Sequence, residues 1–421
     1  MKAIVIARFG GPDVLERQEM PEPVPGAGQK LVQVEAGGLN FADIITARGG
    51  YPGTPKPPLI AGREFCGVRQ PDGQRVMGYT QWAAFAERLA ARSELLWPVP
   101  RGWSAEEGAA FPVNYFTAYF AYWKAGLTGA AQSAVGTPRV LIHAVAGGVG
   151  TAAVQIGKLL GIEMYGTSSS DDKLAGVKKL GLQHGINYKQ QDYEEAVKAL
   201  TNAEGVDAVF EMLGGEHVAK SVRCLRDFGR VIVYGSATGQ KPDLDTRLLY
   251  AKGASVHGLW LTYLSANRKL MDEAWQQLSA WTAQGHLRPV IGQLLPMERA
   301  QDAYRLLSEG RNFGKIVLRM SSNHFMFDSL ESPRDQPVSR RVALFMYALY
   351  FFLGLFCILV SLWRHKMLGL VAFSVLTVLA TVWFVVARSE AEAPTQYKHG
   401  LRMTFLLALG LLPAFISLFR Q

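Results

Sequence analysis

The sequence has few cysteines, and no pattern in which they could pair. Its 421 residues contain three, Cys66, Cys224 and Cys357, which lie far apart along the chain. Small secreted domains depend on dense disulfide frameworks, and structural zinc sites depend on clustered cysteines. Three scattered cysteines exclude both arrangements and favour a reducing compartment.

The first residues do not have the pattern of a secretory signal peptide, and the sequence has no pattern typical of nucleic-acid binding. Its first ten residues are Met-Lys-Ala-Ile-Val-Ile-Ala-Arg-Phe-Gly, an apolar stretch too short and too interrupted for a signal peptide. The net charge is +9, but lysine and arginine form no block and do not alternate with aromatic residues. We therefore expect the N-terminal part to stay in the cytosol, and we expect no nucleic acid among its partners.

Three long runs near the C-terminus contain no Asp, Glu, Lys or Arg. They cover residues 342–363, 367–387 and 403–419, which are 22, 21 and 17 residues long. About 20 apolar residues are needed to cross a bilayer as a helix, so the first two runs are long enough and the third is marginal. The pattern predicts an all-α, three-span transmembrane region over 342–421. The alternative is a set of buried core helices.

Basic residues around these runs predict the orientation of a multi-pass membrane protein. With the N-terminal part inside, six lysines and arginines flank the runs on the cytoplasmic side and three on the other side. We therefore expect the N-terminal part on the cytoplasmic face, attached to the bilayer through a linker over 321–341 that contains prolines.

The strongest positive signal is the stretch 139–150, Arg-Val-Leu-Ile-His-Ala-Val-Ala-Gly-Gly-Val-Gly. Residues 140–142 are predicted as a buried strand, and the glycines open a helix over about 149–160. Such a turn lets a pyrophosphate approach unpaired backbone N–H groups at the positive end of a helix. Further strands are predicted at 164–167, 206–210 and 230–234, at the spacing of βαβ units. The sequence thus predicts a doubly wound parallel sheet that binds a dinucleotide, with a purely structural turn as the alternative.

A β-rich part precedes this α/β block. Short strands are predicted at 2–8, 31–36 and 82–89, separated by clusters of glycine and proline. Within this part lie the segments 37–43 (Gly-Gly-Leu-Asn-Phe-Ala-Asp), Tyr51-Pro52 and 61–67 (Ala-Gly-Arg-Glu-Phe-Cys-Gly). They are followed by 114–119 (Asn-Tyr-Phe-Thr-Ala-Tyr) and 144–150 (Ala-Val-Ala-Gly-Gly-Val-Gly).

The order of these segments resembles the quinone oxidoreductase (zeta-crystallin-like) branch of the medium-chain dehydrogenase/reductase superfamily. Segments 205–215, 229–235, 287–292 and 314–318 extend the resemblance, which covers about residues 1–320 and not the apolar tail. It implies a GroES-like, β-rich substrate domain over 1–113, completed by about 262–320. A Rossmann domain over 114–261 would be inserted into it. The resemblance also implies a homodimer formed through the edge of the Rossmann sheet.

Two positions in the resembling segments indicate chemistry without zinc. Zinc alcohol dehydrogenases of the superfamily have a cysteine and a histidine where this chain has Asn40 and Arg63. An amide and a guanidinium cannot replace a thiolate and an imidazole as zinc ligands. Without a Lewis acid, reduction of an electron-poor quinone or α,β-unsaturated carbonyl needs mainly a positioned hydride and a proton source. We therefore expect a zinc-independent reductase.

The resemblance places Asn40 near the nicotinamide and Tyr51 at the mouth of the substrate cleft. Tyr51 is a candidate proton donor to a carbonyl oxygen, and the equal alternative is a tyrosine that stiffens a proline-rich loop. Asp43 is predicted to hold the Asn40 loop by a hydrogen bond, with a direct role in proton transfer as the alternative. Arg63 and Glu64 are predicted to form an internal ion pair or loop brace. His143 is predicted to be a hydrogen-bonded core histidine.

The end of the second predicted strand indicates the cofactor. A site specific for NAD has an acid there, about 20 residues after the glycine loop, whereas this chain has Ser168-Ser169-Ser170. Ser168 and Lys173 can bind a 2′-phosphate, and the resemblance adds Tyr188 at a phosphate-binding position, so we predict NADPH. Asp171 and Asp172 oppose this prediction unless they act only at a helix N-terminus. The remaining predicted cofactor contacts are Thr117, Ala144, Gly147, Gly148, Val149, Gly150, Gly235 and Ser236, with packing as the alternative for Thr117 and the 235–236 turn.

These observations together predict an NADPH-dependent reductase of quinones or α,β-unsaturated carbonyls that is tethered to a lipid bilayer. Two alternatives stay open. In the first, the chain binds NADPH with little turnover. In the second, it is a redox sensor or an interaction protein in which the membrane region is the functional part.

Overall fold

The computed structural model describes residues 1–128 and 136–320. They belong to one compact unit, Met1–His324. The predicted linker (321–341) and the predicted transmembrane region (342–421) lie outside the described residues. Within the described ranges, no helix combines the length and the apolar character that a bilayer crossing requires.

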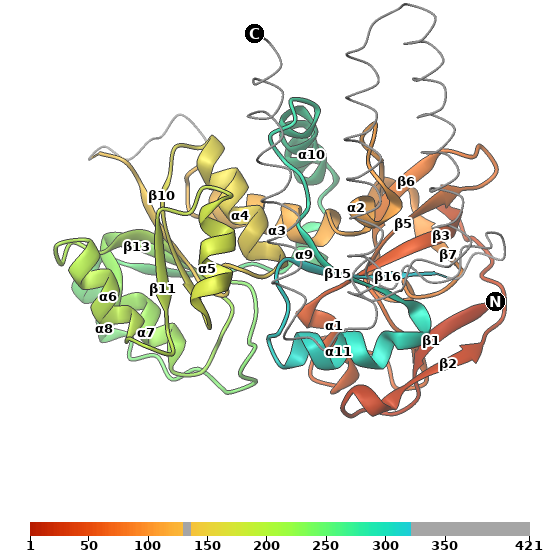
Figure 1. Ribbon diagram of the computed structural model, residues 1–421, viewed down its shortest axis with the longest axis horizontal. Coiled ribbons are helices and arrows are strands. Elements are labelled where there is room, and N and C mark those ends of the chain that lie inside the picture. Colours follow the sequence, from red (N-terminus) through yellow and green to blue (C-terminus); the bar gives the residue numbers. More distant parts are fainter. Residues whose placement is uncertain (129–135, 321–421) are drawn as a thin grey trace, which may run out of the picture. The chain divides into compact units, whose positions relative to one another are not determined.

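A parallel six-stranded sheet forms the α/β part of the described chain (Figure 1). Its strands are β9 (Arg139–Ile142), β10 (Glu163–Ser168), β11 (His184–Asn187), β12 (Val206–Glu211), β13 (Leu225–Val233) and β14 (Ser255–Gly258). Their order is β11-β10-β9-β12-β13-β14, and all neighbours pair in parallel. This is the strand order of dinucleotide-binding sheets, in which ligands bind beyond the carboxyl ends of the strands where the order reverses. Here that point lies between β9 and β12.

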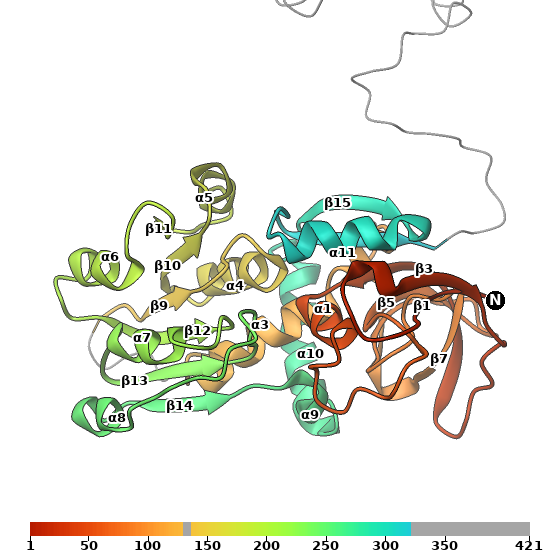
Figure 2. The same cartoon turned by 90° about the horizontal axis from the view of Figure 1, so that it is seen from below.

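Helices cover both faces of this sheet, as Figure 2 shows. Val140 and Ile142 of β9 face the core formed with α3 (Pro112–Lys124), α4 (Gly148–Leu159), α5 (Asp171–Lys178) and α10 (Arg268–Ala283). Leu141, between them, faces the core formed with α6 (Tyr193–Leu200), α7 (His217–Arg223) and α8 (Arg247–Lys252). Alternate strand residues thus serve opposite cores, which explains why these strands are apolar throughout.

The β-rich part contains two sheets. One has the order β2-β1-β4, and the other has the order β15-β16-β3-β5-β6-β8, with β7 paired to β3. The bounds are β1 (Lys2–Ile6), β2 (Leu15–Glu19), β3 (Gln29–Leu39), β4 (Leu59–Ile60), β5 (Glu64–Arg69), β6 (Arg75–Tyr79), β7 (Arg88–Arg92), β8 (Leu96–Pro98), β15 (Ile291–Pro296) and β16 (Lys315–Arg319). Since β16 pairs antiparallel with β3, the chain returns after the α/β part to the sheet in which it began.

The described part also contains four short α-helices, α1 (Phe41–Ala47), α2 (Ala105–Ala109), α9 (Leu261–Leu264) and α11 (Ala300–Ser308), and three 3-10 helices, η1 (Pro12–Val14), η2 (Ser93–Leu95) and η3 (Met297–Arg299). Helix α1 follows β3 directly and packs with α11. Helix α9 follows β14 at the point where the chain leaves the parallel sheet. These two helices bring the segments around Asn40 and Trp260 into the site described below.

The structure confirms most of the predicted elements. The predicted strand 140–142 and helix 149–160 are β9 and α4, and the strands predicted at 164–167 and 206–210 lie within β10 and β12. The strand predicted over 82–89 is wrong for most of its length, because only Arg88 and Leu89 belong to β7. Ala83 has a φ of 72°, and the backbone around it bonds instead to Ile60 and Gly62. These partners come from a distant segment, so local alternation of residues could not reveal them.

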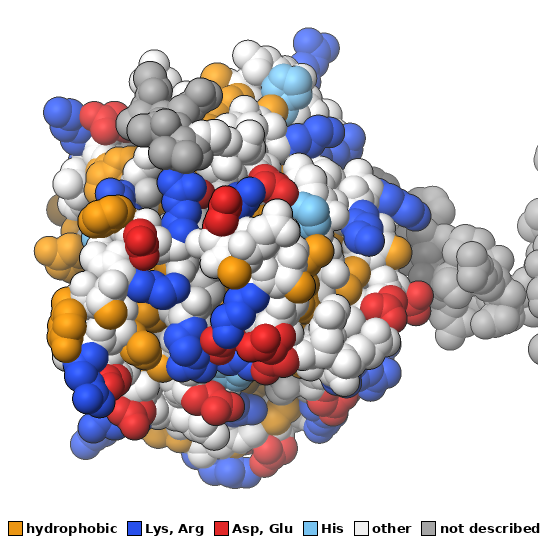
Figure 3. All heavy atoms as spheres, turned by 90° about the vertical axis from the view of Figure 1, so that its left-hand side faces the viewer, with side chains coloured by type: hydrophobic (Ala, Val, Ile, Leu, Met, Phe, Trp, Pro, Cys, Tyr) orange, Lys and Arg blue, Asp and Glu red, His pale blue; other side chains and the backbone are white. Residues whose placement is uncertain are grey.

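The outer face of the α/β part carries charges of both signs. Figure 3 views the side on which α6 and α8 lie and shows lysines and arginines interspersed with acidic side chains. Lys198 pairs with Glu194 and Glu195, and Arg223 pairs with Glu194. Such alternation produces no extended field of one sign on this face, as expected for a solvated surface.

Candidate active site

The glycine loop lies at the carboxyl end of β9, next to the point where the strand order reverses. Ala144 has a φ of 49°, and the N–H of Gly147 donates to its carbonyl oxygen at 2.9 Å, so the chain turns tightly before α4. A Cβ added to Gly150 would lie 2.4 Å from the carbonyl oxygen of Val145. Gly150 is thus required for close packing of helix against strand. The N–H groups of the first turn, Gly148 to Gly150, have no acceptor within the helix and can receive an anion.

Helix α3 supports this loop from the side. A Cβ added to Gly148 would lie 2.7 Å from the Nδ2 atom of Asn114, so the amide of Asn114 lies directly against the loop. Thr117 is buried one turn further along α3. The sequence predicted Thr117 as a cofactor residue and missed Asn114, although Asn114 opens the same segment. The structure therefore brings α3 to the loop, and among the described residues no polar contact of the Thr117 side chain is seen.

Of the three residues predicted to bind a 2′-phosphate, Ser168 and Tyr188 lie at the carboxyl ends of β10 and β11, and Lys173 lies in α5. Ser168 is the last residue of β10, and its carbonyl oxygen accepts from the N–H of Tyr188 at 3.1 Å. The side chain of Tyr188 is half exposed. Lys173 lies in the first turn of α5, where its ammonium group donates to the carbonyl oxygen of Gly310. Desolvation, and then the neighbouring Lys189, lower the pKa of Lys173. The negative charge of a bound anion would offset both effects, because it stabilises the charged ammonium group.

Two loops lie beside each other beyond β12 and β13. The N–H of Ala237 donates to the carbonyl oxygen of Met212 at 2.8 Å, and a Cβ on Gly214 would lie 2.5 Å from the Oγ atom of Ser236. Glu211 closes β12, and its Oε1 atom accepts from the N–H groups of Leu213 and Gly214. The predicted contacts Gly235 and Ser236 thus belong to a loop pair that Glu211 holds in place.

Asn40 lies within a buried set of charged groups. Its Oδ1 atom accepts from the Nζ atom of Lys315 at 2.6 Å, and its Nδ2 atom donates to Oε1 of Glu64 at 2.8 Å. Lys315 and Glu64 also form an ion pair with each other. The other oxygen of Glu64 accepts from the N–H of Val113 at the start of α3. Both ends of the Asn40 amide are therefore engaged, and its plane is fixed.

The segment that leads into β16 connects this set to the glycine loop. Gly314 pairs with Gly147 in an isolated parallel bridge, and its N–H donates to the carbonyl oxygen of Ala146 at 2.7 Å. The next residue, Lys315, reaches Asn40. A short piece of chain thus spans from the loop predicted to bind the pyrophosphate to the amide predicted to lie near the nicotinamide.

Asp43 and Arg63 form a second buried group beside Asn40. The N–H of Asn40 donates to Oδ2 of Asp43 at 2.8 Å, so the prediction that Asp43 holds this loop is confirmed. The Nε atom of Arg63 lies 3.5 Å from Oδ1 of Asp43, and its terminal nitrogens donate to Thr46 and to the carbonyl oxygen of Gln81. Burial raises the pKa of Asp43 to about 6, and the positive charge of Arg63 opposes the rise. Arg63 and Glu64 do not form an ion pair with each other, because Glu64 pairs with Lys315; Arg63 instead acts as the predicted loop brace through Asp43, Thr46 and Gln81.

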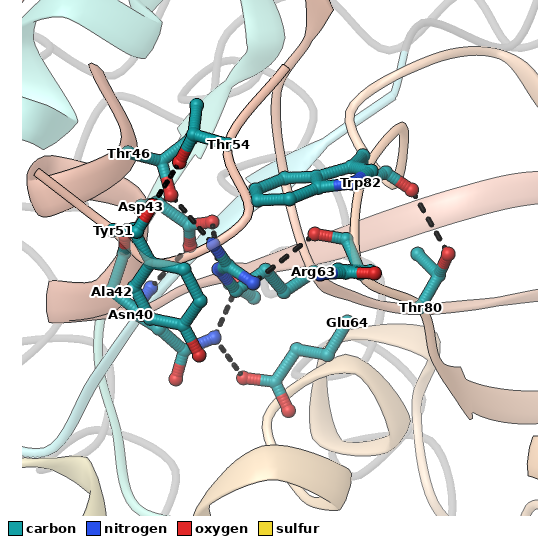
Figure 4. Close-up of polar contacts among 12 residues, drawn as sticks. Asn40, Ala42, Asp43, Thr46, Tyr51, Thr54, Arg63, Glu64, Thr80 and Trp82 are labelled. Atoms are coloured by element: carbon teal, nitrogen blue, oxygen red, sulfur yellow. Dashed lines mark hydrogen bonds and ion pairs between the residues drawn. The ribbon is translucent and has the colours of Figure 1, made fainter. Parts of the chain in front are cut away.

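Tyr51 lies on the guanidinium of Arg63 (Figure 4). The Cζ atom of Arg63 is 3.7 Å from the centre of the Tyr51 ring and 4.6 Å from the centre of the Trp82 ring. The Tyr51 hydroxyl accepts a hydrogen bond of 2.7 Å from the Nε1 atom of Trp260. Tyr51 is thus fixed in place and partly exposed beside the Asn40 group.

The remaining predicted residue, His143, belongs to the core. Its side chain is fully buried and lies within hydrogen-bonding distance of Thr167 and Ser221. Burial lowers the pKa of His143 to about 4, so the imidazole is neutral. The prediction of a core histidine is confirmed.

Sequence reasoning missed the roles of Lys315 and Trp260. Lys315 follows a glycine and begins an apolar strand, and a lysine in such a position is seldom buried without a partner, so a signal existed. Trp260 left no signal, since 209 residues separate it from Tyr51.

Comparison with known proteins agrees with this geometry. Residues 148–282 match the family model described as zinc-binding dehydrogenase, a range that contains neither Asn40 nor Arg63. The human synaptic vesicle membrane protein VAT-1 homolog is 33% identical, over 76% of this chain and 86% of that protein. The quinone oxidoreductase of Mus musculus is 31% identical, over 76% of this chain and 97% of that protein. The quinone oxidoreductase of Thermus thermophilus, solved also with NADPH, is 36% identical with a TM-score of 0.66, over 76% of this chain and all of that one.

The strand order, the glycine loop and the returning C-terminal strand define the fold of a medium-chain dehydrogenase/reductase. With these relatives, the chain belongs to the quinone oxidoreductase, zeta-crystallin-like branch of that superfamily. It is therefore a member of an oxidoreductase family of which solved structures carry NADPH.

Proposed function

We propose that this chain is an NADPH-dependent, zinc-independent reductase of quinones or α,β-unsaturated carbonyls. One observation carries the proposal. Where zinc-dependent members of the superfamily have a metal ligand, Asn40 is held by Lys315 and Glu64, and Tyr51 lies beside it with its hydroxyl accepting from Trp260. The hydrogen of that hydroxyl can then be donated to a substrate. The proposal includes the domain boundaries 1–113 with 262–320, and 114–261.

The residues present fit a dinucleotide. The first turn of α4 would hold the pyrophosphate, and Ser168, Lys173 and Tyr188 would hold the 2′-phosphate. Lys173 would exchange the carbonyl oxygen of Gly310 for the phosphate, a charge-assisted partner that binds an ammonium group more strongly. Ala144, Val149, Thr117, Gly235 and Ser236 would line the rest of the site. When bound, NADPH supplies a hydride from its nicotinamide ring.

The side chains of this chain would then orient the substrate and deliver a proton. Asn40, whose amide is held by Lys315 and Glu64, would line one side of the site in which the nicotinamide ring binds. Tyr51 would donate its proton to the substrate oxygen that becomes electron-rich during reduction. The Tyr51 oxygen would later regain a proton from water. Holding the donor in place on Arg63 avoids reorganisation during the reaction.

We place the enzyme at a membrane through residues 342–421, whose apolar runs would hold it near a lipophilic acceptor. The test is carbonate extraction of membranes that contain the full chain or a chain ending at Met320. The full chain should stay with the lipid and the shortened one should not. The proposal also includes a second copy as a partner, joined at the edge strand β14.

The activity is tested with the purified full chain, a soluble ortho-quinone and an enone, measuring oxidation of NADPH beside NADH. We expect turnover with a clear preference for NADPH. Lys173→Met should raise the KM for NADPH about tenfold and leave that for NADH unchanged, because one charge-assisted contact to the phosphate is lost. Lys178→Met, an exposed lysine of the same helix, is the matched control.

The outcomes separate the candidate functions. Tight NADPH binding without turnover on either substrate class would favour the binding or sensor function. Absence of NADPH binding would remove the basis of the proposal. An equal effect of both lysine variants would show that Lys173 has no special role at the phosphate.

A further inference from the structure

Trp260 reaches the candidate proton donor from a distant part of the chain. It lies two residues after β14, the edge strand of the parallel sheet, and just before α9. Its indole N–H donates to the Tyr51 hydroxyl at 2.7 Å, and the two rings meet edge to face with centres 6.3 Å apart. A second contact joins the same parts of the molecule, since the hydroxyls of Tyr79 and Thr262 lie 2.6 Å apart. The position of Trp260 is therefore fixed independently of Tyr51.

Tyr51 is held on three sides. Arg63 lies against the face of its ring, Trp82 meets the ring edge to face at 6.2 Å, and Trp260 bonds the hydroxyl. Arg63 and Trp82 contact only the ring, so neither controls where the hydroxyl hydrogen points. The contact with Trp260 is the one described contact that acts on the reacting atom itself.

The chemistry of the two groups gives this contact a direction. A phenol oxygen carries one hydrogen and can accept hydrogen bonds, whereas an indole N–H can only donate. The Tyr51 oxygen must therefore be the acceptor, and its hydrogen must point away from the indole. The same N–H remains a donor after the proton has left, when the oxygen carries negative charge and a hydrogen bond to it is stronger.

We infer that Trp260 is a positioning residue that aims the hydroxyl hydrogen of Tyr51 at the substrate and stabilises the oxygen after proton transfer. This inference rests on the proposed reductase function. In the step concerned, the O–H bond of Tyr51 breaks and a new bond forms between that proton and the substrate oxygen. When bound, the cofactor would supply the hydride, and water would later return a proton to Tyr51. The direction of the Tyr51 hydroxyl hydrogen thus depends on Trp260, which lies just after β14 in the chain.

The first test is kinetic and uses the full chain with NADPH and a soluble ortho-quinone. Trp260→Phe keeps an aromatic ring and removes the donor, so we expect kcat to fall about tenfold while the KM for quinone and the Kd for NADPH change less than twofold. In a Tyr51→Phe background the same substitution should have no further effect on kcat. Trp123→Phe is the matched control, because Trp123 and Trp260 are 41% and 40% exposed and Trp123 lies at the far end of α3.

The second test does not depend on turnover. In protein labelled with ¹⁵N-tryptophan, the indole resonance of Trp260 is identified by its loss in Trp260→Phe. Tyr51→Phe should shift that resonance and leave that of Trp123 unchanged.

Several outcomes would overturn the inference. A Trp260 resonance that does not move in Tyr51→Phe would show that the hydrogen bond is absent. Equal losses of kcat from Trp260→Phe in both backgrounds, or an effect on KM alone, would show that Trp260 does not act through Tyr51. Absence of turnover in the unmodified protein would instead overturn the proposed function, and the resonance would still decide whether the contact exists.

Discussion

Two buried polar clusters lie near the candidate site, and they differ in how they satisfy their charges. The histidine cluster consists of His143, Thr167, Glu211 and Ser221, which lie at the ends of strands and on α7. Glu211 accepts from Ser221 at 2.6 Å and from two backbone N–H groups, and His143 lies 3.0 Å from Thr167. This cluster is closed, since its polar atoms bond to one another or to adjacent backbone.

The arginine cluster consists of Asp43, Thr46 and Arg63, with the ring of Tyr51 against it. Its central contact is looser, because the Nε atom of Arg63 has no hydrogen-bond partner among the described residues and lies 3.5 Å from Asp43. The face of the guanidinium is covered by aromatic rings, of which Tyr51 is partly exposed. This cluster thus presents a fixed side chain to the outside, whereas the histidine cluster holds strand ends together.

The comparison shows that a perturbed pKa alone does not identify a reacting group. Burial shifts the pKa of both His143 and Asp43, in opposite senses because one is charged when protonated and the other when deprotonated. Of the two, the arginine cluster is the one in contact with Tyr51, the partly exposed candidate proton donor. Substitutions in that cluster should therefore affect turnover, and those in the histidine cluster should affect stability.

The largest effect is expected for Arg63→Met. It leaves the carboxylate of Asp43 buried without its positive partner and removes the support of the Tyr51 ring. We expect the free energy of unfolding to fall by about 3–5 kcal/mol and kcat/KM to fall about 100-fold. Thermal unfolding and steady-state kinetics of the full chain measure both. Arg63→Lys keeps the charge and should recover part of the stability but little activity, since the planar group is lost. Normal activity in Arg63→Met would show that the arginine cluster does not support turnover, and the proposed difference between the two clusters would be wrong.

The next effect concerns pH and the histidine cluster. The pKa of His143 is lowered to about 4 in the folded chain, against about 6.5 when unfolded, so the unfolded chain binds more protons between these values. The stability contributed by neutral His143 is complete above pH 6.5 and is lost as pH falls toward 4, by about 3 kcal/mol in all.

The measurement for His143 is the difference in unfolding free energy between the unmodified chain and His143→Gln across that pH range. A difference that stays constant would contradict the prediction. Taking a difference also removes the opposite contribution of Asp43, whose raised pKa reduces stability as pH rises toward 6.

A smaller effect is expected for Glu211→Gln. The amide retains one acceptor oxygen, but its NH₂ group would face either Ser221 or the N–H groups of Leu213 and Gly214. We expect a loss of about 1–2 kcal/mol in unfolding free energy and a change in kcat below twofold. A selective loss of kcat with unchanged stability would show that the histidine cluster takes part in the reaction.

The smallest effect should have the opposite sign. The hydroxyl of Tyr304 is buried near Asp43 and has no hydrogen-bond partner among the described residues, and burial raises its pKa well above the usual value. Tyr304→Phe removes this unpaired group, so we expect a gain of about 0.5–1 kcal/mol in unfolding free energy with unchanged kinetics. A loss of stability would show that the hydroxyl has a partner in solution.

Some of the site could be predicted from the sequence because its cause is local. The apolar residues 140–142 and the glycines after them specify a strand, a tight turn and a helix within a dozen residues. Asp43 holds Asn40 across three positions, which is the spacing of a helix start. The absence of an acidic residue at the end of β10 is likewise evident from the local sequence Ser168-Ser169-Ser170. In each case the interacting groups are close in the chain, so the pattern of residues contains the interaction.

The tertiary structure alone decided which distant side chains meet. Lys315 and Asn40 are 275 positions apart, and Trp260 and Tyr51 are 209 apart. Arg63 and Glu64 are adjacent in the chain, yet at the start of β5 they point to opposite sides and pair with Asp43 and Lys315. The return of β16 to β3 and the exit of the chain after β14 bring these partners together. Charge and residue type fixed which groups need a partner when buried, and the path of the chain determined which partner each one found.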